Sequence, residues 1–391
     1  MKDTECLKFM RHLVKLAEDK LNFGVRPLHS LEEHLDGAAE WLLRAQRATP
    51  DDGVAHSYDV KAQRWLASYP ETTGYIIPTL YDYARYFDKP GCASAAARMA
   101  HWECDVQLED GGVRAGTMDA EIVVPTIFNT GQVLFGWARA YHETGDERFK
   151  GSLRRAADWL VAAQDDDGAW RRFPSPFTST KVSAYNTRSA FGLVRAFEAL
   201  DDERYLAAAV ANVDWVIRTA HSNRWIPGNC LIERANDAAL THTIAYSIRG
   251  ILEVGQAAKR EGFIEQALVM ARAVAATQRP DGALPGQLSR DWQGIKPWTC
   301  VTGNSQMAIN WQRLARITGE TQLRECAVRA NRFNMSIQDL VAKNQAIRGA
   351  LKGSHPINGG YMTWRYPNWA AKFFMDALML EYLGDRVANI G

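Results

Sequence analysis

Apolar residues recur at helical spacing along most of the chain and alternate with charged positions. Such amphipathic segments are typical of half-buried helices that turn one apolar stripe inward. Five segments have this pattern: LEEHLDGAAEWLLRAQ, AAARMAHWECDVQ, LRRAADWLVAAQ, YLAAAVANVDWVI and IEQALVMARAVAATQ.

A second set of helical segments has a less polar face and follows a glycine-containing loop. The loops begin at residues 51, 109, 166, 222, 280 and 347, a period of about 57 residues that stretches to about 67 before the last. The helices after them are TTGYIIPTLYDYARYF, NTGQVLFGWARAYHETG, NTRSAFGLVRAFEAL, THTIAYSIRGILEVG, TGNSQMAINWQRLARITG and PNWAAKFFMDALMLEYLG.

Six repeats, each with one amphipathic and one more apolar helix, predict two concentric rings of helices. We expect an all-α fold, an (α/α)6 toroid with six inner helices and six or seven outer helices. Closure of the ring removes the need for the capping repeats that end an open solenoid. The whole chain, residues 1–391, is then a single (α/α)6 barrel domain, with residues 1–30 as a helix on its outer wall.

The polar residues that open the apolar helices are the first candidates for a site. In a toroid of this kind every inner helix begins at the same end, so these residues should converge on one funnel with the positive ends of the helix dipoles. They are Glu71, Thr72, Tyr75, Asn129, Asn186, Arg188, His242, Asn304, Gln306 and Asn368. A structural alternative stays open: Thr72, Asn129 and Asn186 suit helix N-caps, and Arg188 and Lys372 suit ion pairs.

The loops that would form the rim of this funnel combine aromatic and charged side chains. Aromatic faces beside hydroxyl, amide and ionic groups suit a sugar, whose C–H face stacks on a ring while its hydroxyls need donors and acceptors. The loop candidates are Tyr58, Asp59, Arg114, Asp119, Glu121, Tyr185, Trp298, His355, Tyr361 and Arg365.

Charge and composition limit the classes of partner and the cellular location that we expect. The formal net charge of +1 comes from intermixed Lys, Arg, Asp and Glu without a basic run, which argues against a nucleic-acid partner. No apolar stretch of about 18 residues predicts a membrane span, and no signal peptide is visible. Six cysteines without CxxC spacing predict a reducing, cytoplasmic location.

The sequence QDDDGAW, residues 164–170, resembles the Q-x-x-D-G-x-W repeat of squalene-hopene and related terpene cyclases. In that family the motif links the end of an outer helix to the next turn. The resemblance therefore supports the toroid fold and gives no information about the reaction. The acidic D-x-D-D signature of those enzymes is absent. Cys230, Asp237, His242, Cys300 and His355 resemble a zinc set of related toroids, but no pair has compact helical spacing, so we expect no metal and no other cofactor.

The stretches SYPETTGYIIPT (68–79) and YPNWAAKFFMDAL (366–378) resemble toroid proteins of bacterial exopolysaccharide and capsule biosynthesis. This resemblance covers nearly the whole chain and implies a glycan substrate and polysaccharide-assembly partners. Glucuronyl C5-epimerases, α/α-barrel glycoside hydrolases and several polysaccharide lyases are related in fold, but none of their complete catalytic signatures matches this sequence.

Two sets of catalytic groups therefore stay open. Glycoside hydrolysis, which we favour, requires two carboxyl groups: Glu71 with Asp119 or Glu121, and Asp59 and Asp237 in reserve. Epimerisation or lysis at a uronate requires neutralisation of its carboxylate by Arg188, Arg365, Asn129 or Asn304, and proton transfer by Tyr185, Tyr361, His242 or His355. Further alternatives are a non-catalytic glycan-binding or assembly protein and a terpenoid-cyclase-like protein.

Overall fold

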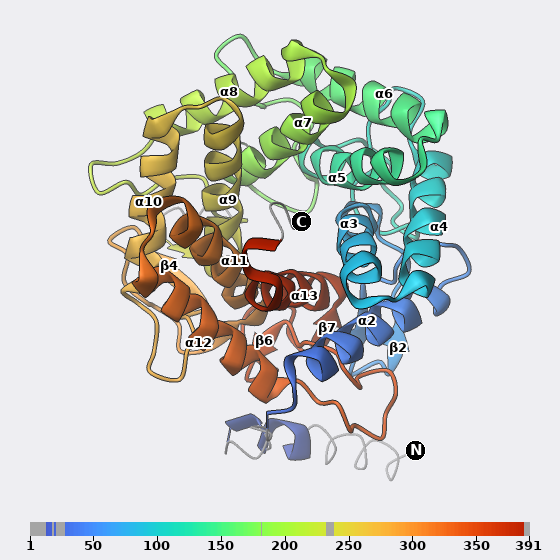
Figure 1. The fold of residues 1–391 in the computed structure, drawn as a ribbon, viewed down its shortest axis with the longest axis vertical. Helices are drawn as coiled ribbons and strands as arrows, with labels where there is room; N and C mark the ends of the chain where they lie inside the picture. Colours follow the sequence, from blue (N-terminus) through green and yellow to red (C-terminus); the bar gives the residue numbers. More distant parts are fainter. Residues whose placement is uncertain (1–12, 18, 21–27, 181, 232–237, 387–391) are drawn as a thin grey trace.

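The computed structural model describes residues 13–17, 19–20, 28–180, 182–231 and 238–386, and it confirms the predicted toroid (Figure 1). Each inner helix contacts the next one along the chain, and the last contacts the first, which closes the ring. The inner helices are α3 (Pro70–Phe87), α5 (Ile127–Thr144), α7 (Thr187–Leu200), α9 (Thr241–Ala257), α11 (Val301–Thr318) and α13 (Asn368–Leu383).

The outer ring alternates with the inner one along the chain. Five of its helices coincide with the predicted amphipathic segments, and α12 adds the outer helix that those segments do not include. The outer helices are α2 (Leu31–Arg47), α4 (Pro90–Val106), α6 (Glu147–Ala163), α8 (Glu203–Arg218), α10 (Glu261–Ala275) and α12 (Thr321–Ile337).

The difference in polarity between the two sets follows from their positions. An inner helix is covered on one side by outer helices and on the other by the opposite inner helices, so in α13 every residue from 368 to 380 is buried. An outer helix such as α6 buries only its apolar stripe, which includes Phe149, Leu153, Ala156 and Leu160. The chain therefore needs one nearly apolar helix and one amphipathic helix in each repeat.

A glutamine and a glycine tie successive outer helices together. At the end of α6, Gln164 Nε2 donates to Gly168 O at 3.0 Å and to Ala208 O of α8 at 2.9 Å. Gln107, Gln278 and Gln338 make the same pair of bonds in their own repeats. The Q-x-x-D-G-x-W stretch is therefore a structural tie between neighbouring repeats, as its resemblance implies.

The helix starts differ from the expected N-caps. Thr72 and Asn129 lie inside the first turn, because α3 begins at Pro70 and α5 at Ile127. Asn186 precedes α7, but its side chain makes no capping bond. First-turn side chains instead hold the preceding loop: Thr73 Oγ1 accepts from Val54 N and Thr130 Oγ1 from Val113 N, both at 2.9 Å.

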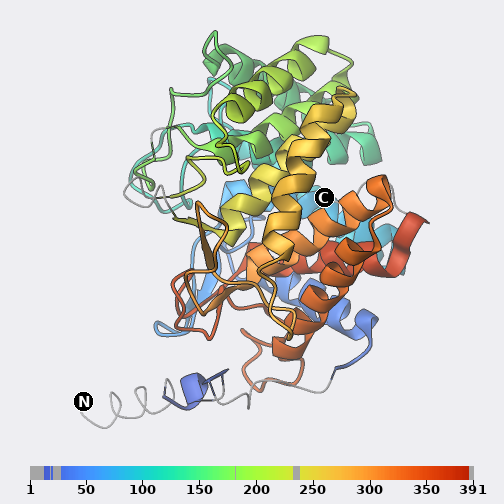
Figure 2. The ribbon, with the colours of Figure 1, turned by 90° about the vertical axis from the view of Figure 1, so that its left-hand side faces the viewer.

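Short strands and long loops gather at the end of the ring where the inner helices begin (Figure 2). They form one three-stranded sheet in the order β2-β1-β7 and two antiparallel pairs, β3 with β4 and β5 with β6. Two short 3-10 helices, η1 (Ala184–Asn186) and η3 (Gly384–Arg386), complete the connections. The strands are β1 (Ser57–Asp59), β2 (Arg64–Trp65), β3 (Ala238–Leu240), β4 (Gln287–Ser289), β5 (Thr299–Cys300), β6 (Ser354–His355) and β7 (Arg365–Pro367).

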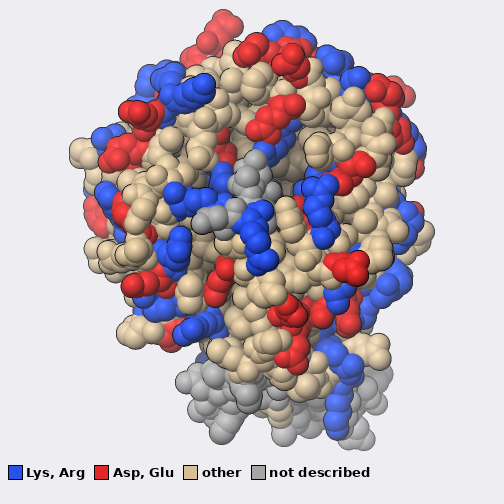
Figure 3. Space-filling view, viewed as in Figure 1, with Lys and Arg blue, Asp and Glu red and all other residues tan. Residues whose placement is uncertain are grey.

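The face seen in Figure 3 carries interspersed acidic and basic side chains. Within the described parts of the chain, no helix combines the length and the apolar character needed to cross a membrane. Part of the predicted helix over residues 1–30 lies outside the described residues, whereas 13–17 and 19–20 are helical and Asp19 is buried. That residues 1–391 form one domain stays a prediction.

Candidate functional site

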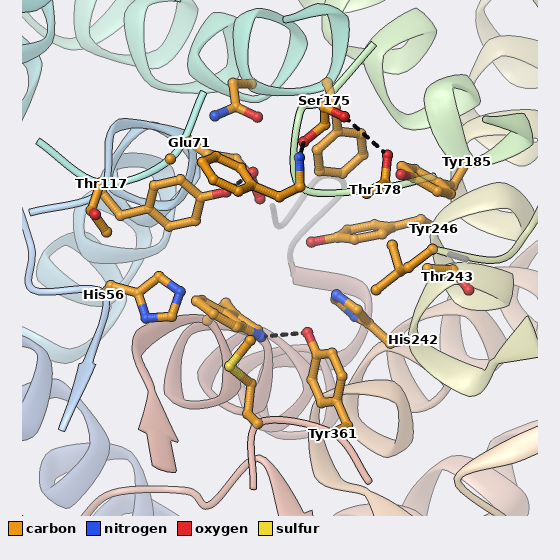
Figure 4. A pocket seen from close by; sticks show the side chains of 18 of the residues that line it. His56, Glu71, Thr117, Ser175, Thr178, Tyr185, His242, Thr243, Tyr246 and Tyr361 are labelled. Carbon is orange, nitrogen blue, oxygen red and sulfur yellow. Dashed lines mark hydrogen bonds between the residues drawn. The ribbon is translucent and has the colours of Figure 1, made fainter. Parts of the chain in front are cut away.

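A cavity of about 440 Å3 opens at the end of the ring where the inner helices begin. In Figure 4, labelled side chains of the inner helices α3 and α9 and of the connecting loops surround its open centre; α5 and α13 also contribute to the lining. Both its volume and its mixture of aromatic and polar groups are typical of a small-ligand site. The lining residues include His56, Tyr69, Glu71, Tyr75, Phe128, Asn129, Phe177, Tyr185, His242, Tyr246, Tyr361, Arg365 and Trp369.

Equivalent positions of different inner helices supply the floor of the cavity. The second residue of α3, α5, α9 and α13 lines it in each case, namely Glu71, Phe128, His242 and Trp369. One turn later, Tyr75 of α3 and Tyr246 of α9 line it as well. Residues four apart share one helix face, so the repeat places two layers of side chains around one axis.

Glu71 is the only carboxylate among the described residues that line the cavity. Burial raises its pKa to about 7, although a hydrogen bond from the Tyr69 hydroxyl opposes this shift. Burial and the Glu71 charge together raise the pKa of Tyr69 well above its usual value, so Tyr69 is the donor in this pair. A carboxyl group with a pKa near neutrality can give or take a proton under ordinary conditions.

His242 lies across the cavity from Glu71 (Figure 4). Its Nδ1 is 2.7 Å from Gln306 Oε1 of α11, an acceptor, so this nitrogen carries the proton and Nε2 keeps its lone pair. Burial lowers the pKa of His242 to about 4. Gln306 therefore positions a neutral imidazole, which can accept a proton.

A second imidazole and a hydrogen-bonded pair complete the wall. His56 lies on the side of the cavity opposite His242, and burial lowers its pKa to about 3 (Figure 4). Its ring is 4.8 Å from the ring of Trp369, whose Nε1 donates to the Tyr361 hydroxyl at 2.9 Å. Burial raises the pKa values of Tyr75, Tyr246 and Tyr361, so their hydroxyl groups keep their protons and serve as donors.

Cationic side chains lie beneath this floor, in the centre of the ring. Arg188, the second residue of α7, is buried with its guanidinium 4.3 Å from the centre of the Phe135 ring. Lys372 is buried beside Asp376, to which its ammonium donates. Burial lowers the pKa of Arg188 to about 10 and that of Lys372 to about 8, so both are charged at neutral pH.

The structure brings seven of the sequence-predicted residues into the cavity lining. They are Glu71, Tyr75, Asn129, Tyr185, His242, Tyr361 and Arg365. Asn129 also donates to Arg114 O at 2.8 Å, and Arg365 lies 3.5 Å from Asp59, so both of these side chains have protein partners as well. Their roles toward a ligand stay predictions.

Several other predicted residues hold the chain together outside the lining. Asn368 donates to Ala55 O and to Thr72 Oγ1, which joins α13 to α3 and to the first loop. Asn304 accepts from Leu284 N at 3.1 Å and donates to Ala330 O, and Arg114 donates to Ala120 O at 2.8 Å. These polar side chains satisfy buried backbone groups, a need that their sequence positions do not reveal.

The remaining aromatic and polar candidates are also displaced from the lining. Tyr58 packs against Trp65, Trp298 against Gly286 and Gly360, and His355 against Phe333. Asp59 accepts from the amides of Lys61 and Ala62, and Asn186 borders a smaller cavity of about 20 Å3.

Neither proposed second carboxylate lies in the cavity lining. Asp119 is exposed and accepts a hydrogen bond from Thr117 at 2.6 Å, and Glu121 is exposed in the same loop. Asp119 is near enough to the site for its charge to favour the protonated form of His56. Asp237, a reserve candidate, lies outside the described residues.

Sequence reasoning missed Tyr69, Tyr246, Trp369 and His56. A signal for three of them is present: Tyr69 is two residues before Glu71, Tyr246 is four residues after His242, and Trp369 is the second residue of its helix. His56 carries no such signal, because only the loop between α2 and α3 directs it inward. Within the described residues, no group of three or more His, Cys, Asp or Glu side chains is placed to hold a metal ion.

Comparisons with known proteins support the same architecture. A family model described as pectic acid lyase matches residues 97–226, about a third of the chain. A search of curated protein sequences gives no match.

Solved structures resemble the whole toroid. An unsaturated glucuronyl hydrolase specific for heparin superposes with a TM-score of 0.72 at 16% identity, over 91% of this chain and 98% of that one. A cellobiose 2-epimerase from Bacillus thermoamylovorans gives 0.72 at 9% identity over 91% and 98%. A GH76 alpha-mannanase from Bacteroides thetaiotaomicron gives 0.64 at 14% identity over 91% and 98%. At these identities the likeness establishes the (α/α)6 fold.

Proposed function

We propose that the protein is a carbohydrate-active enzyme that transfers a proton at a sugar bound in the cavity. The observation that carries this proposal is the pairing of Glu71, with a pKa of about 7, and neutral His242 across one cavity of about 440 Å3. Pectic acid lyase, glucuronyl hydrolase, cellobiose epimerase and mannanase, which the chain resembles in part or in fold, are all named for carbohydrate chemistry.

Epimerisation or lysis fits these groups better than hydrolysis by two carboxylates. Hydrolysis requires a second carboxyl group at the scissile bond, and Glu71 has no such partner among the described lining residues. Hydrolysis remains a second candidate because the exposed Asp119 is close enough to the site for its charge to raise the pKa of His56.

In the proposed reaction, Nε2 of His242 removes a proton from a sugar carbon next to a carbonyl or carboxyl group. The electron pair left by the broken C–H bond moves onto the oxygen and forms an enolate. The hydroxyl groups of Tyr75, Tyr246 and Tyr361 are the donors available to stabilise it. Glu71 then returns a proton to the carbon from the other face, which gives an epimer. Alternatively, Glu71 protonates a departing β-oxygen, which gives an unsaturated product.

The pH profile follows from these assignments. His242 accepts a proton only when it is neutral, above about pH 4, and Glu71 donates only when it is protonated, below about pH 7. Activity should therefore be highest between these values and fall as the pH rises through about 7. Tyr69→Phe removes a hydrogen bond that lowers the pKa of Glu71, so it should move the upper limb to higher pH.

The test is incubation of the protein in deuterium oxide with oligogalacturonates, glucuronate-containing oligosaccharides, cellobiose and mannan, followed by NMR and mass spectrometry. Deuterium on a ring carbon indicates epimerisation, an unsaturated product a lyase, and new reducing ends hydrolysis. Glu71→Gln should lower turnover about 100-fold or more while the sugar still binds. Full turnover by Glu71→Gln would contradict its role, and no reaction with any of these glycans would contradict the proposal.

A further inference from the structure

Phe177 lies at the solvent end of the cavity and is 60% exposed. It belongs to the loop between α6 and α7, which also contributes Ser175 and Thr178 to the lining. Aromatic side chains are typical of the lining of ligand pockets, and the exposed ring of Phe177 is available for such a contact.

The protein holds the Phe177 ring in a defined place. A Cβ atom added at Gly116 would lie 2.8 Å from Cε2 of Phe177, so the ring packs directly on the backbone of the neighbouring loop. Gly116 has a φ of +70°, a conformation that favours glycine. The Ala115 amide donates to Val124 O at 2.8 Å, which braces this loop.

The acid–base groups and Phe177 occupy two levels of one cavity. His242 and Tyr246 are buried at the floor, whereas Phe177 and the partly exposed Thr178 lie at the mouth. A sugar that reacts at the floor would place the next ring of its chain at the mouth. There an aromatic surface can cover the C–H face of that ring, and hydroxyl groups are near its edge.

We infer that Phe177 is a stacking platform for a second sugar ring, so that the substrate is an oligosaccharide or polysaccharide and not a free monosaccharide. This inference rests on the proposed function and specifies its substrate class. Phe177 contributes to binding at the mouth and takes no part in proton transfer.

Phe173 provides a matched control in the same loop. It is 38% exposed, its ring packs on Trp159 at 4.8 Å between centroids, and it is not among the residues that line the main cavity. Both Phe→Ala changes remove an exposed ring, so a general effect on stability or solubility should be similar. Only the Phe177 change should affect a longer glycan.

The experiment measures binding by NMR line broadening for three pairs of probes: galacturonate and trigalacturonate, glucose and cellotriose, mannose and mannotriose. For the pair that binds, the wild-type protein should prefer the trisaccharide. Phe177→Ala should weaken trisaccharide binding about tenfold and leave the monosaccharide unchanged, whereas Phe173→Ala should change neither. Gly116→Ala, which displaces the ring, should reproduce the loss.

The outcomes separate this inference from the function on which it rests. If Phe177→Ala binds the trisaccharide as tightly as wild type does, or weakens the monosaccharide equally, the platform is refuted while a sugar site remains. If the wild-type protein binds none of the six probes, the proposed sugar site fails and the platform fails with it.

Discussion

Two glutamates, Glu71 and Glu103, show how the same side chain can serve opposite purposes in one protein: Glu71 is partly exposed, whereas Glu103 is buried. Burial raises the pKa of both carboxyl groups. Glu71 faces the cavity and accepts from Tyr69, whereas Glu103 on α4 is fully buried and neither of its oxygens has a hydrogen-bond partner among the described residues. In the proposed reaction Glu71 exchanges a proton with the sugar, whereas Glu103 only adds an unfavourable desolvation energy.

We predict that Glu103→Met stabilises the protein at pH 8 by about 1–3 kcal/mol, because it removes an unsatisfied buried polar group. The raised pKa means that the folded protein binds more protons than the unfolded chain. The free energy of unfolding of wild type should therefore fall as the pH rises above the usual pKa of 4.5, and this slope should be smaller in the variant.

Urea denaturation between pH 5 and pH 8 measures both effects. Glu109→Met, at an exposed carboxylate, is the control and should leave the pH slope unchanged. Equal slopes for wild type and Glu103→Met would show that Glu103 does not govern this pH dependence.

Among the elements, the ties between outer helices depend on glycine. A Cβ atom at Gly168 would lie 2.2 Å from the carbonyl oxygen of Ala211 in α8, and the residue has a φ of +93°. Gly145 also has a positive φ, of +69°, but no atom of the described residues lies within 4 Å of a Cβ placed there. Substitution of Gly168 would therefore cause both backbone strain and a steric clash, whereas substitution of Gly145 would cause backbone strain alone.

We expect Gly168→Ala to lower the free energy of unfolding by more than about 3 kcal/mol. The cost of backbone strain at residue 168 and the cost of displacing α8 contribute together. Gly145→Ala should lower it by only about 1 kcal/mol, since it carries strain alone. Chemical denaturation of both variants tests this, and equal losses would mean that the contact with α8 adds nothing.

The loop that carries Tyr361 and leads to Arg365 of β7 is held in place by a buried ion pair. Lys352 Nζ lies 2.6 Å from Asp19 Oδ1, and the Ile357 amide donates to Asp19 Oδ2 at 2.8 Å. Both side chains are nearly inaccessible, at 3% and 0% exposure, so each needs the other. The N-terminal segment thereby positions one wall of the cavity.

Lys352→Met should leave Asp19 buried without its cation and destabilise this loop by about 3–5 kcal/mol. Hydrogen exchange should then show a loss of protection at the Ile357 amide that exceeds any loss in α5. Lys89→Met breaks an exposed pair with Asp36 at 2.7 Å and should cost less than about 1 kcal/mol. Unchanged protection at Ile357 would mean that the ion pair does not hold the loop.

At the scale of the whole molecule, charged groups fill the centre of the ring where apolar residues could have met. Glu253 of α9 lies 2.7 Å from Arg249 and 2.8 Å from Arg313 of α11. Burial alone would raise the pKa of Glu253, but the two guanidinium groups outweigh it and lower the pKa to about 2. This carboxylate therefore joins two neighbouring inner helices and offsets the cations below the site.

Glu253→Gln should lower the free energy of unfolding at pH 7 by about 3–5 kcal/mol, because two buried guanidinium groups lose their anion. The contribution of a lowered pKa is complete above the unfolded pKa of about 4.5 and is lost as the pH falls toward 2. The difference between wild type and variant should therefore shrink below about pH 4.5. Denaturation curves at pH 7, 5 and 4 measure it, with Glu147→Gln, which breaks an exposed pair with Lys150, as the control; a constant difference would contradict the assignment.

The sequence alone determined the architecture of this protein. Apolar spacing and a glycine repeat identify the inner helices, since a helix surrounded by protein must be apolar on nearly all sides and an outer helix on one stripe only. The common direction of the inner helices likewise places Glu71 and His242 at one end of the ring, where both line the cavity.

Only the tertiary structure decided which polar residues face that cavity. Periodicity locates the start of a helix within a turn, but one residue rotates a side chain by about 100° around the helix axis. Thr72, Asn304 and Asn368 therefore bond to backbone and neighbouring helices, while Tyr246 points inward. Loop residues such as His56 and Phe177 depend on contacts between distant segments, which no local pattern in the sequence records.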